Sequence, residues 1–173
     1  MELFEAIANR RSIRQFKPDA PVSEEALNKI FNAAIMAPSA GNHQCWRFIA
    51  VKDKALKKRL ATDVGHQLFI EHAAVAVVVV ADLARAQEKY GERGRGTYAL
   101  QESAAAAENM LLAARALGLG ACWIGSFEET AASQILGIPD GQRPVAIIPI
   151  GVPDEPAIRV PPRRRIEDVV EYR

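Results

Sequence analysis

The clearest helical pattern begins after Ser23, where a capping hydroxyl and two acidic residues precede a stripe of apolar residues. Pro38 ends that pattern, so a helix is predicted between the two positions. A longer helix is predicted over roughly 98–117, because Gly118 follows it as a C-terminal cap. Its alanine run at 104–107 favours helix and leaves room for a neighbouring element to approach closely.

Continuous apolar runs predict the strands. Residues 74–81 are rich in valine and lack polar alternation, which is typical of a strand buried on both faces. Further strands are expected at 46–51, 121–124 and 145–152. Two helices precede the first strand and long helices separate the later ones, so the βαβ rhythm is poor. The pattern therefore favours an α+β fold, with a small sheet packed by helices, one of them long and central.

Two regions lack a clear pattern. The stretch Tyr90–Thr97 holds three glycines among charged residues, and we expect it to be mobile. The tail, 153–173, is expected to begin extended because of Pro153, Pro156, Pro161 and Pro162. We interpret residues 1–173 as a single domain whose tail lies across another surface, with a dimer partner as the natural candidate.

The composition excludes several classes of protein. Hydrophobic residues make up 49% and charged residues 25% of 173 positions, so a largely disordered chain is not expected. The 22 basic and 21 acidic residues leave a net charge of +1, which argues against a general nucleic-acid or membrane-surface binder. Two cysteines are too few for a disulfide framework. No apolar run is long enough to cross a bilayer or typical of a signal peptide, so we expect a cytoplasmic protein.

Familiar catalytic motifs are absent from the sequence. The histidines His43, His66 and His72 lack metal-ligand spacing, and no HExxH or CxxC occurs. The glycine pair at 118–120 follows a predicted helix and precedes a strand, the reverse of a Rossmann turn. We therefore predict no metal site, no catalytic acid or nucleophile from the chain, and neither a hydrolase nor a kinase.

Two basic clusters are candidate anion ligands. The first puts three guanidiniums and a hydroxyl within five residues, a donor set that matches phosphate oxygens: Arg10, Arg11, Ser12 and Arg14. The second is the triplet Arg163–Arg165 in the tail. Taken singly, the first could equally be a solvated basic turn, and the second is more typical of a charged tail.

A polar loop supplies the third cluster. Between Pro38 and the strand that begins at Trp46, the chain offers Ser39, Asn42 and Gln44 as neutral hydrogen-bonding groups. Its ordinary interpretation is a polar loop ahead of a strand. Together the three clusters suit a ligand with an anionic end, a polyhydroxy middle and a flat heteroaromatic end. Flavin mononucleotide (FMN) has that shape, and so do other nucleotides.

At four motifs the chain resembles the FMN-dependent nitroreductase family, in order and over nearly its whole length. The motifs are Arg10–Phe16, Ala37–Gln44, Gly118–Gly125 and Arg163–Val170. The resemblance implies a three-layer fold with a small, mainly antiparallel sheet, and a homodimer with an FMN site in each half of its interface. The chain departs from the family at two positions. Family members usually have proline at the position of Cys45 and often have it at the position of Arg165.

The resemblance also implies roles for individual residues. By the resemblance, Arg10 and Ser12 bind the phosphate and the ribityl chain of FMN, and Arg163 or Arg164 of the tail assists them. Arg14 lies toward the N1/O2 edge of the flavin ring. A fixed positive charge there stabilises the reduced, anionic flavin. The full cofactor-binding set is Arg10, Arg11, Ser12, Arg14, Pro38, Ser39, Asn42, Gln44, Ile124, Gly125, Arg163 and Arg164.

Within that set, the loop residues match the segment that contacts the flavin from the partner subunit. Ile124 and Gly125 match the segment whose backbone N–H groups face the N5 side of the ring. Two polar residues of the long helix, Glu102 and Asn109, are interpreted as structural rather than functional.

The implied activity is an FMN-dependent oxidoreductase that takes electrons from NADH or NADPH in a ping-pong reaction. The flavin carries the electrons, which accounts for the missing catalytic groups. The short stretch Tyr90–Thr97 implies little lid, and an open site favours flat acceptors such as nitroaromatics or quinones. Two alternatives remain: a flavin-binding carrier or sensor without turnover, and a nucleotide-binding module without flavin.

Overall fold

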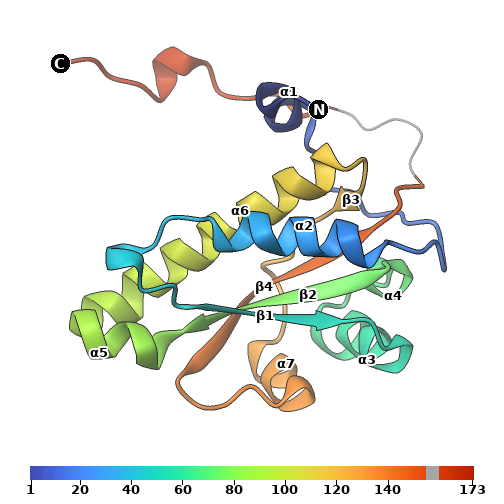
Figure 1. Cartoon of the computed structure of the whole chain (residues 1–173), viewed down its shortest axis with the longest axis horizontal. Coiled ribbons are helices and arrows are strands. Elements are labelled where there is room, and N and C mark those ends of the chain that lie inside the picture. The colour runs from blue at the N-terminus through green and yellow to red at the C-terminus, as the bar shows by residue number, and fades with distance from the viewer. Residues whose placement is uncertain (155–159) are drawn as a thin grey trace.

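A four-stranded antiparallel sheet lies at the centre of the computed structural model, in the strand order β1-β2-β4-β3 (Figure 1). The structure describes residues 1–154 and 160–173, so the part of the predicted tail that includes Pro156 lies outside the described residues. Along the chain the elements are α1 (Leu3–Asn9), α2 (Glu24–Ile35), η1 (Ala40–Asn42), β1 (Trp46–Val51), α3 (Lys54–Arg59), η2 (Leu60–Val64), α4 (Phe69–His72), β2 (Val75–Asp82), α5 (Leu83–Arg93), η3 (Gly94–Tyr98), α6 (Ala99–Ala116), β3 (Gly120–Ala121), α7 (Glu129–Leu136), β4 (Gln142–Gly151) and η4 (Ile166–Asp168).

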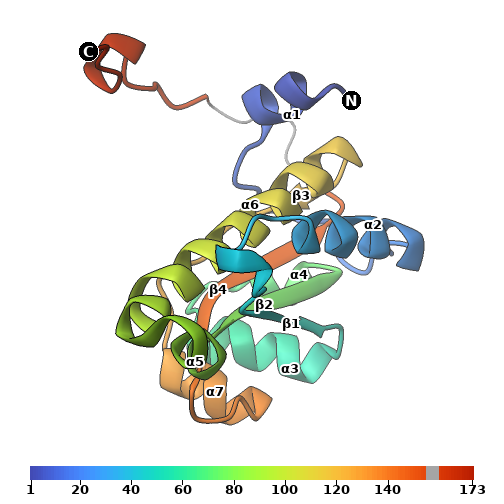
Figure 2. The same ribbon diagram turned by 60° about the vertical axis from the view of Figure 1, so that its left-hand side comes forward.

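The central strand β2 separates two hydrophobic cores. Val75, Val77 and Val79 pack on one face of the sheet with the buried residues of α2 and α6. The residues between them face the opposite side, where η2 and α7 cover the sheet. Because successive side chains of a strand point to opposite faces, a strand covered on both sides is apolar throughout. The predicted α+β arrangement, three layers with a small antiparallel sheet and a long helix, is confirmed (Figures 1 and 2).

Helix ends fall where the sequence places its capping residues. The Ser23 side chain accepts a hydrogen bond of 3.1 Å from the Ala26 N–H and begins α2. Gly118 has φ of +75° directly beyond α6, and Gly137 has φ of +62° directly beyond α7. Such left-handed positions favour glycine because a Cβ atom strains them. Local chemistry therefore sets the limits of the helices that position the site.

Residues 90–97, which we expected to be mobile, are helical. They complete α5 and form η3, where the ring of Tyr90 packs edge-on against that of Tyr98 with centroids 5.3 Å apart. A Cβ atom on Gly94 would stand 2.2 Å from the Ala86 carbonyl oxygen. This glycine is required by close packing, whereas the sequence interpretation took it as a sign of flexibility.

The structure also changes the bounds of the last two predicted strands. β3 is limited to Gly120 and Ala121, and Ile124, placed in the same strand by the sequence, forms an isolated bridge with Ile147. β4 begins earlier than predicted, at Gln142. The short β3 follows directly on the end of α6, and this connection brings the site segment 118–125 alongside the N-terminal segment.

The two ends of the chain present apolar side chains to solvent. In α1 only Ala6 is buried, while Leu3, Phe4 and Ile7 are 60%, 82% and 50% exposed. All of residues 160–173 are exposed, including Ile166 and Tyr172. Figure 2 shows the C-terminal segment, in red, clear of the sheet and of the helices that cover it. In the described part of the chain, no helix is both long and apolar enough to cross a membrane.

Candidate flavin site

The first group of predicted site residues follows α1 and runs beside β3. Ser12 forms a parallel bridge with Ala121, whose carbonyl accepts a 3.0 Å hydrogen bond from the Ile13 N–H. Ile13 is buried, whereas Arg10 and Ser12 are half-buried and Arg14 is exposed. The segment therefore brings a hydroxyl and two guanidiniums, none of them buried, next to β3.

The two arginines that begin this group differ in their contacts. The Arg10 Nε atom lies 3.6 Å from Glu108 Oε1, which holds the guanidinium beside α6. Arg11 Nη1 instead donates to the carbonyls of Ala8, at 2.8 Å, and Arg10, at 2.7 Å. Cations at a helix C-terminus commonly bond its unpaired carbonyls in this way. Arg11 therefore serves α1 itself, which makes it the weakest candidate among the predicted phosphate ligands.

The second group is the loop before β1, whose backbone is unusual. Gly41, Asn42 and Gln44 have φ of +52°, +56° and +55°. Ser39 Oγ accepts a 3.1 Å hydrogen bond from the Gln44 N–H, and Gln44 Nε2 donates to Asn42 Oδ1 at 3.2 Å. The predicted polar residues thus bond one another and fix the loop. Non-glycine residues in this region are strained and concentrate at functional sites.

Glu102 ties both ends of this loop to α6. Its carboxylate is buried and accepts hydrogen bonds from the Ala40 N–H at 2.8 Å and the Cys45 N–H at 3.1 Å. Asn109, further along α6, donates from Nδ2 to the Ala33 carbonyl of α2 at 2.9 Å. Both residues therefore make the structural contacts that the sequence interpretation expects of them.

Cys45, at the position usually held by proline in the family it resembles, contributes through its backbone. A proline has no N–H and could not make the bond to Glu102. Burial, followed by the negative charge of Glu102, raises the pKa of the Cys45 thiol to about 11. The thiol is therefore protonated at neutral pH and is no nucleophile.

The outer side of the loop rests on α5. Arg85 Nε donates to the His43 carbonyl at 3.0 Å, and the His43 ring bonds the Arg85 carbonyl at 2.9 Å. Lys89 Nζ donates to the Gly41 carbonyl at 3.2 Å. The sequence analysis missed these supports because α5 carries no pattern that links it to a loop some forty residues earlier.

A shallow pocket opens beside the loop. Its volume is about 220 Å³, and its walls include Pro38, Ser39, Tyr98 and Gln101. Arg93 lies over the Tyr98 ring, and its Nε donates to the Tyr98 hydroxyl at 2.8 Å. Arg93, in the stretch that we expected to be mobile, thus packs against Tyr98 of the pocket wall.

The third group, Ile124 and Gly125, is only partly available to a ligand. The Ile124 N–H donates to the Ile147 carbonyl at 3.0 Å, and the reverse bond is 2.9 Å. Between the two backbone donors predicted here, Gly125 is the one without a hydrogen bond to another described residue. Gly125 is exposed and is the stronger candidate to face a flavin.

The tail arginines lie apart from the other groups. Arg164 donates to the Asp168 carbonyl at 2.6 Å within the tail, and Arg163 is exposed. Within residues 1–154 and 160–173 the structure gives neither side chain a hydrogen bond or ion pair with the other groups. One chain alone does not bring the tail arginines to Arg10 and Ser12.

The loop and the N-terminal group belong to opposite ends of α6. Glu102 ties the loop to its first turns, whereas Ser12 pairs with β3 beyond its last turn. A helix of 18 residues is roughly 27 Å long, so a single chain presents the two half sites of the predicted flavin site separately (Figure 1). The described residues contain no group of three or more His, Cys, Asp or Glu side chains that could hold a metal ion.

Chemically, the half sites suit the parts of FMN. Arg10 and Ser12 offer donors to phosphate and hydroxyl oxygens, and the exposed Arg14 adds a cation in the same segment. The strained loop and the Gly125 N–H supply hydrogen-bonding groups for a heteroaromatic ring. The residues present therefore fit the cofactor that the motifs imply.

Comparison with known proteins decides the family. The nitroreductase family model matches residues 7–69 and 61–152. The chain belongs to the nitroreductase family. A crystal structure of a nitroreductase family protein from Clostridium novyi NT is 32% identical, has a TM-score of 0.81, and covers 90% of this chain and 87% of its own. The nitroreductase-like fold implied by the motifs is confirmed.

Two relatives carry more informative names. A protein of Archaeoglobus fulgidus, provisionally named NADH dehydrogenase/NAD(P)H nitroreductase, is 37% identical over 158 residues, which are 89% of this chain and 87% of the relative. The FMN reductase (NADPH) of Bacillus subtilis is 32% identical over 162 residues, which are 86% of this chain and 65% of the relative. Their names associate the family with nicotinamide donors and with flavin.

Proposed function

We propose that this nitroreductase is an FMN-dependent oxidoreductase that uses NADH or NADPH to reduce nitroaromatic or quinone-like acceptors. The observation that carries the proposal is the bridge that holds Ser12, with Arg10 and Arg14 two residues to either side, next to β3 in a chain whose relatives are named for FMN and NAD(P)H. Bound FMN supplies the two-electron chemistry, so the chain needs no acid, base or nucleophile of its own.

Each group of residues has its own task in this proposal. Arg10 and Ser12 bind the phosphate and ribityl chain, and Arg163 or Arg164 assists. Arg14 holds a positive charge at the N1/O2 edge, where it favours the reduced and negatively charged flavin. The Gly125 N–H faces the opposite edge of the ring. The loop around Ser39, with Asn42 and Gln44, closes the site from a second subunit.

Donor and acceptor use one space in turn. The pocket beside Pro38 and Tyr98 is shallow and open, which suits flat aromatic molecules that enter and leave the same face of a ring. The nicotinamide donor leaves before the acceptor enters, so the kinetics are ping-pong. The same openness disfavours a substrate that must be fully enclosed.

A homodimer unites the half sites. The exposed apolar side chains of α1 and of the tail, such as Phe4 and Tyr172, form a surface that a second copy covers. The two half sites at opposite ends of α6 then meet across the interface. The whole chain, 1–173, acts as one domain in this assembly, with its tail on the partner.

A cytoplasmic location completes the proposal. Both cysteines are buried and neither forms a disulfide, which suits a reducing compartment, where structural disulfides are rare. Nicotinamide donors are supplied in the same compartment.

The test is a visible absorption spectrum of the purified protein under argon, before and after NADH and then NADPH. Flavin bands that bleach with either donor are the expected result, and a screen of nitroaromatics and quinones then identifies the acceptor. Flavin bands that persist would favour a carrier or sensor. A colourless protein that FMN does not reconstitute would favour a nucleotide-binding module without flavin.

A further inference from the structure

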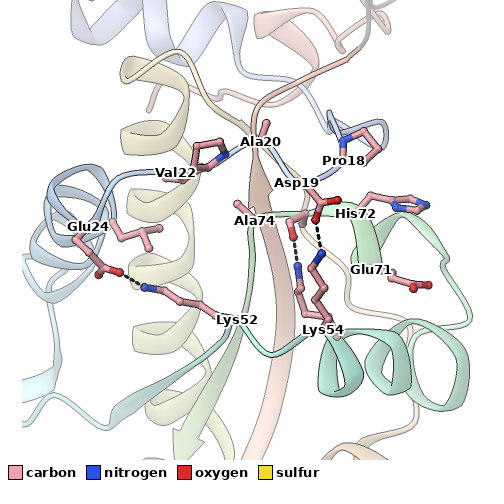
Figure 3. A pocket seen from close by; sticks show the side chains of 14 residues that line it. Pro18, Asp19, Ala20, Val22, Glu24, Lys52, Lys54, Glu71, His72 and Ala74 are labelled. Atoms are coloured by element: carbon pink, nitrogen blue, oxygen red, sulfur yellow. Dashed lines mark hydrogen bonds and ion pairs between the residues drawn. The ribbon is translucent and has the colours of Figure 1, made fainter.

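A second pocket lies at the end of the sheet where β1 stops and β2 starts. Its volume is about 420 Å³, which is in the range of sites for small molecules. The segment before α2, the first turns of α2 and α3, and the end of α4 surround it (Figure 3). None of its lining residues belongs to the predicted flavin-binding set.

Two ion pairs form opposite walls of this pocket. On one side Lys52 bonds Glu24, and on the other Lys54 Nζ lies 2.6 Å from Asp19 Oδ1 (Figure 3). Each pair neutralises its own charges at the exposed rim. The surface between the walls includes the apolar residues Pro21, Val22, Leu27 and Ala74. These four residues form an apolar bed between two neutral walls.

Lys57, at the bottom of the pocket, is in a different state from the rim lysines. It is only 6% exposed, and its Nζ donates to the Ala73 carbonyl. An ammonium has three N–H groups, and the described residues supply only this one acceptor. Burial lowers the pKa of Lys57, the nearby Lys54 charge acts in the same direction, and Asp19 and Glu71 oppose them. A buried cation with unfilled donors is costly unless an acceptor completes its bonds.

We propose that this pocket binds a small organic carboxylate, whose oxygens accept hydrogen bonds from Lys57 and whose carbon skeleton packs on the apolar bed. Among the described lysines of the lining, Lys57 alone lacks a carboxylate partner in an ion pair. One such cation matches a monoanion. The partly buried Glu71 at the pocket's edge repels the additional charge of a phosphate dianion.

The direct test is calorimetric titration of the purified flavoprotein with cyclohexanecarboxylate. The aliphatic ring of this probe does not stack flat on a flavin, and the flavin absorption spectrum is followed to detect any binding there. Lys57→Met keeps a side chain of similar length without the charge, and Lys58→Met is the matched control on the exposed side of α3. We expect saturable binding that Lys57→Met weakens at least about tenfold, because it removes a charge-assisted hydrogen bond. Lys58→Met should stay within about twofold of the wild type.

A second variant keeps Lys57 and fills the pocket. Ala20→Phe, in the partly exposed segment that lines one side, should also weaken binding at least about tenfold by steric exclusion. Reductive methylation followed by mass spectrometry locates the ligand, since the carboxylate should protect Lys57 and leave Lys58 reactive.

Three results would overturn the proposal. They are the absence of saturable binding to the wild type, equal affinity of Lys57→Met and the wild type, and displacement of the probe by an equal concentration of inorganic phosphate. Each of them leaves the flavin reaction untouched, so failure here is distinguishable from failure of the proposed function.

Discussion

The two halves of the candidate flavin site are supported to very different extents. The loop half, 38–44, is bonded by Glu102, Arg85 and Lys89 of its own chain, which fix its backbone from two sides. The arginine half adjoins α1, whose apolar side chains are exposed, and the tail arginines that are proposed to complete it lie elsewhere in the same chain. One half is therefore shaped by folding of the chain, and the proposed dimer completes the other.

This contrast has a physical reason. Asn42 and Gln44, the two non-glycine loop residues in left-handed conformations, cost free energy that neighbouring contacts must offset. Such a loop is stable only where several contacts of the fold hold it in place. A phosphate-binding site depends more on positive charge close to the phosphate than on a rigid backbone. That charge can come from the side chains of a second chain. A preformed loop also lowers the entropy that ligand binding costs.

The largest expected effect comes from removing the tail. Truncation after Pro153 should abolish both dimer formation and FMN binding, because it deletes the tail arginines and their apolar neighbours while leaving the sheet intact. Sedimentation velocity and the flavin absorption of the purified protein measure the two losses. A truncated protein that stays yellow and dimeric would show that both halves are complete without the tail.

A smaller effect is expected from one arginine of the N-terminal group. Arg14→Ala should weaken FMN binding about tenfold or more, or lower the reduction potential, because the reduced flavin loses its cation. Arg11→Ala is the matched control, since Arg11 bonds the end of α1, and it should leave FMN affinity within about twofold. Fluorescence titration and a redox titration of both variants make the comparison. Equal effects of the two substitutions would contradict the assignment.

The loop half is tested by Glu102→Gln. The amide nitrogen that replaces one carboxylate oxygen meets a backbone N–H, so one of the two bonds to Ala40 and Cys45 is lost. We expect a loss of about 1–3 kcal/mol in the free energy of unfolding, with weaker FMN binding in the dimer. Denaturant titration measures the first and fluorescence titration the second. Glu88→Gln, which removes an exposed carboxylate of α5, should change neither.

The smallest effect is expected outside both halves, at Glu129 on α7. Both oxygens of this carboxylate bond Arg143, at 2.8 and 2.7 Å, and these bonds hold the Glu129 pKa below its ordinary value of 4.5. A carboxyl with a lowered pKa stabilises the fold at neutral pH, and the contribution disappears as the pH falls through the lowered value.

Because the pair is largely exposed, Glu129→Gln should cost no more than about 1 kcal/mol at pH 7. Thermal unfolding followed from pH 7 downward should show the full difference between variant and wild type at pH 7 and a decreasing difference as the pH falls below 4.5. FMN affinity should not change. If it falls with this variant, affinity follows global stability, and the contrast between the two halves loses its support.

The identity of the elements was largely predictable. Ser23, Gly118 and Gly137 mark helix limits through local chemistry, and the valine run 75–80 indicates a strand covered on both faces. Gly94 shows where such reasoning fails. A glycine among charged residues indicates flexibility in a sequence, but here a packed carbonyl leaves no space for a Cβ atom.

Motifs in the sequence determined the family and a list of candidate residues, because those residues lie within a few positions of one another. Only the tertiary structure decided how they are used. It assigned Arg11 to α1, committed the Ile124 N–H to Ile147, and joined both ends of the loop to Glu102. These contacts join residues that lie far apart in the chain or depend on the local path of the backbone. Composition and spacing carry no record of which hydrogen-bonding groups the fold has already used.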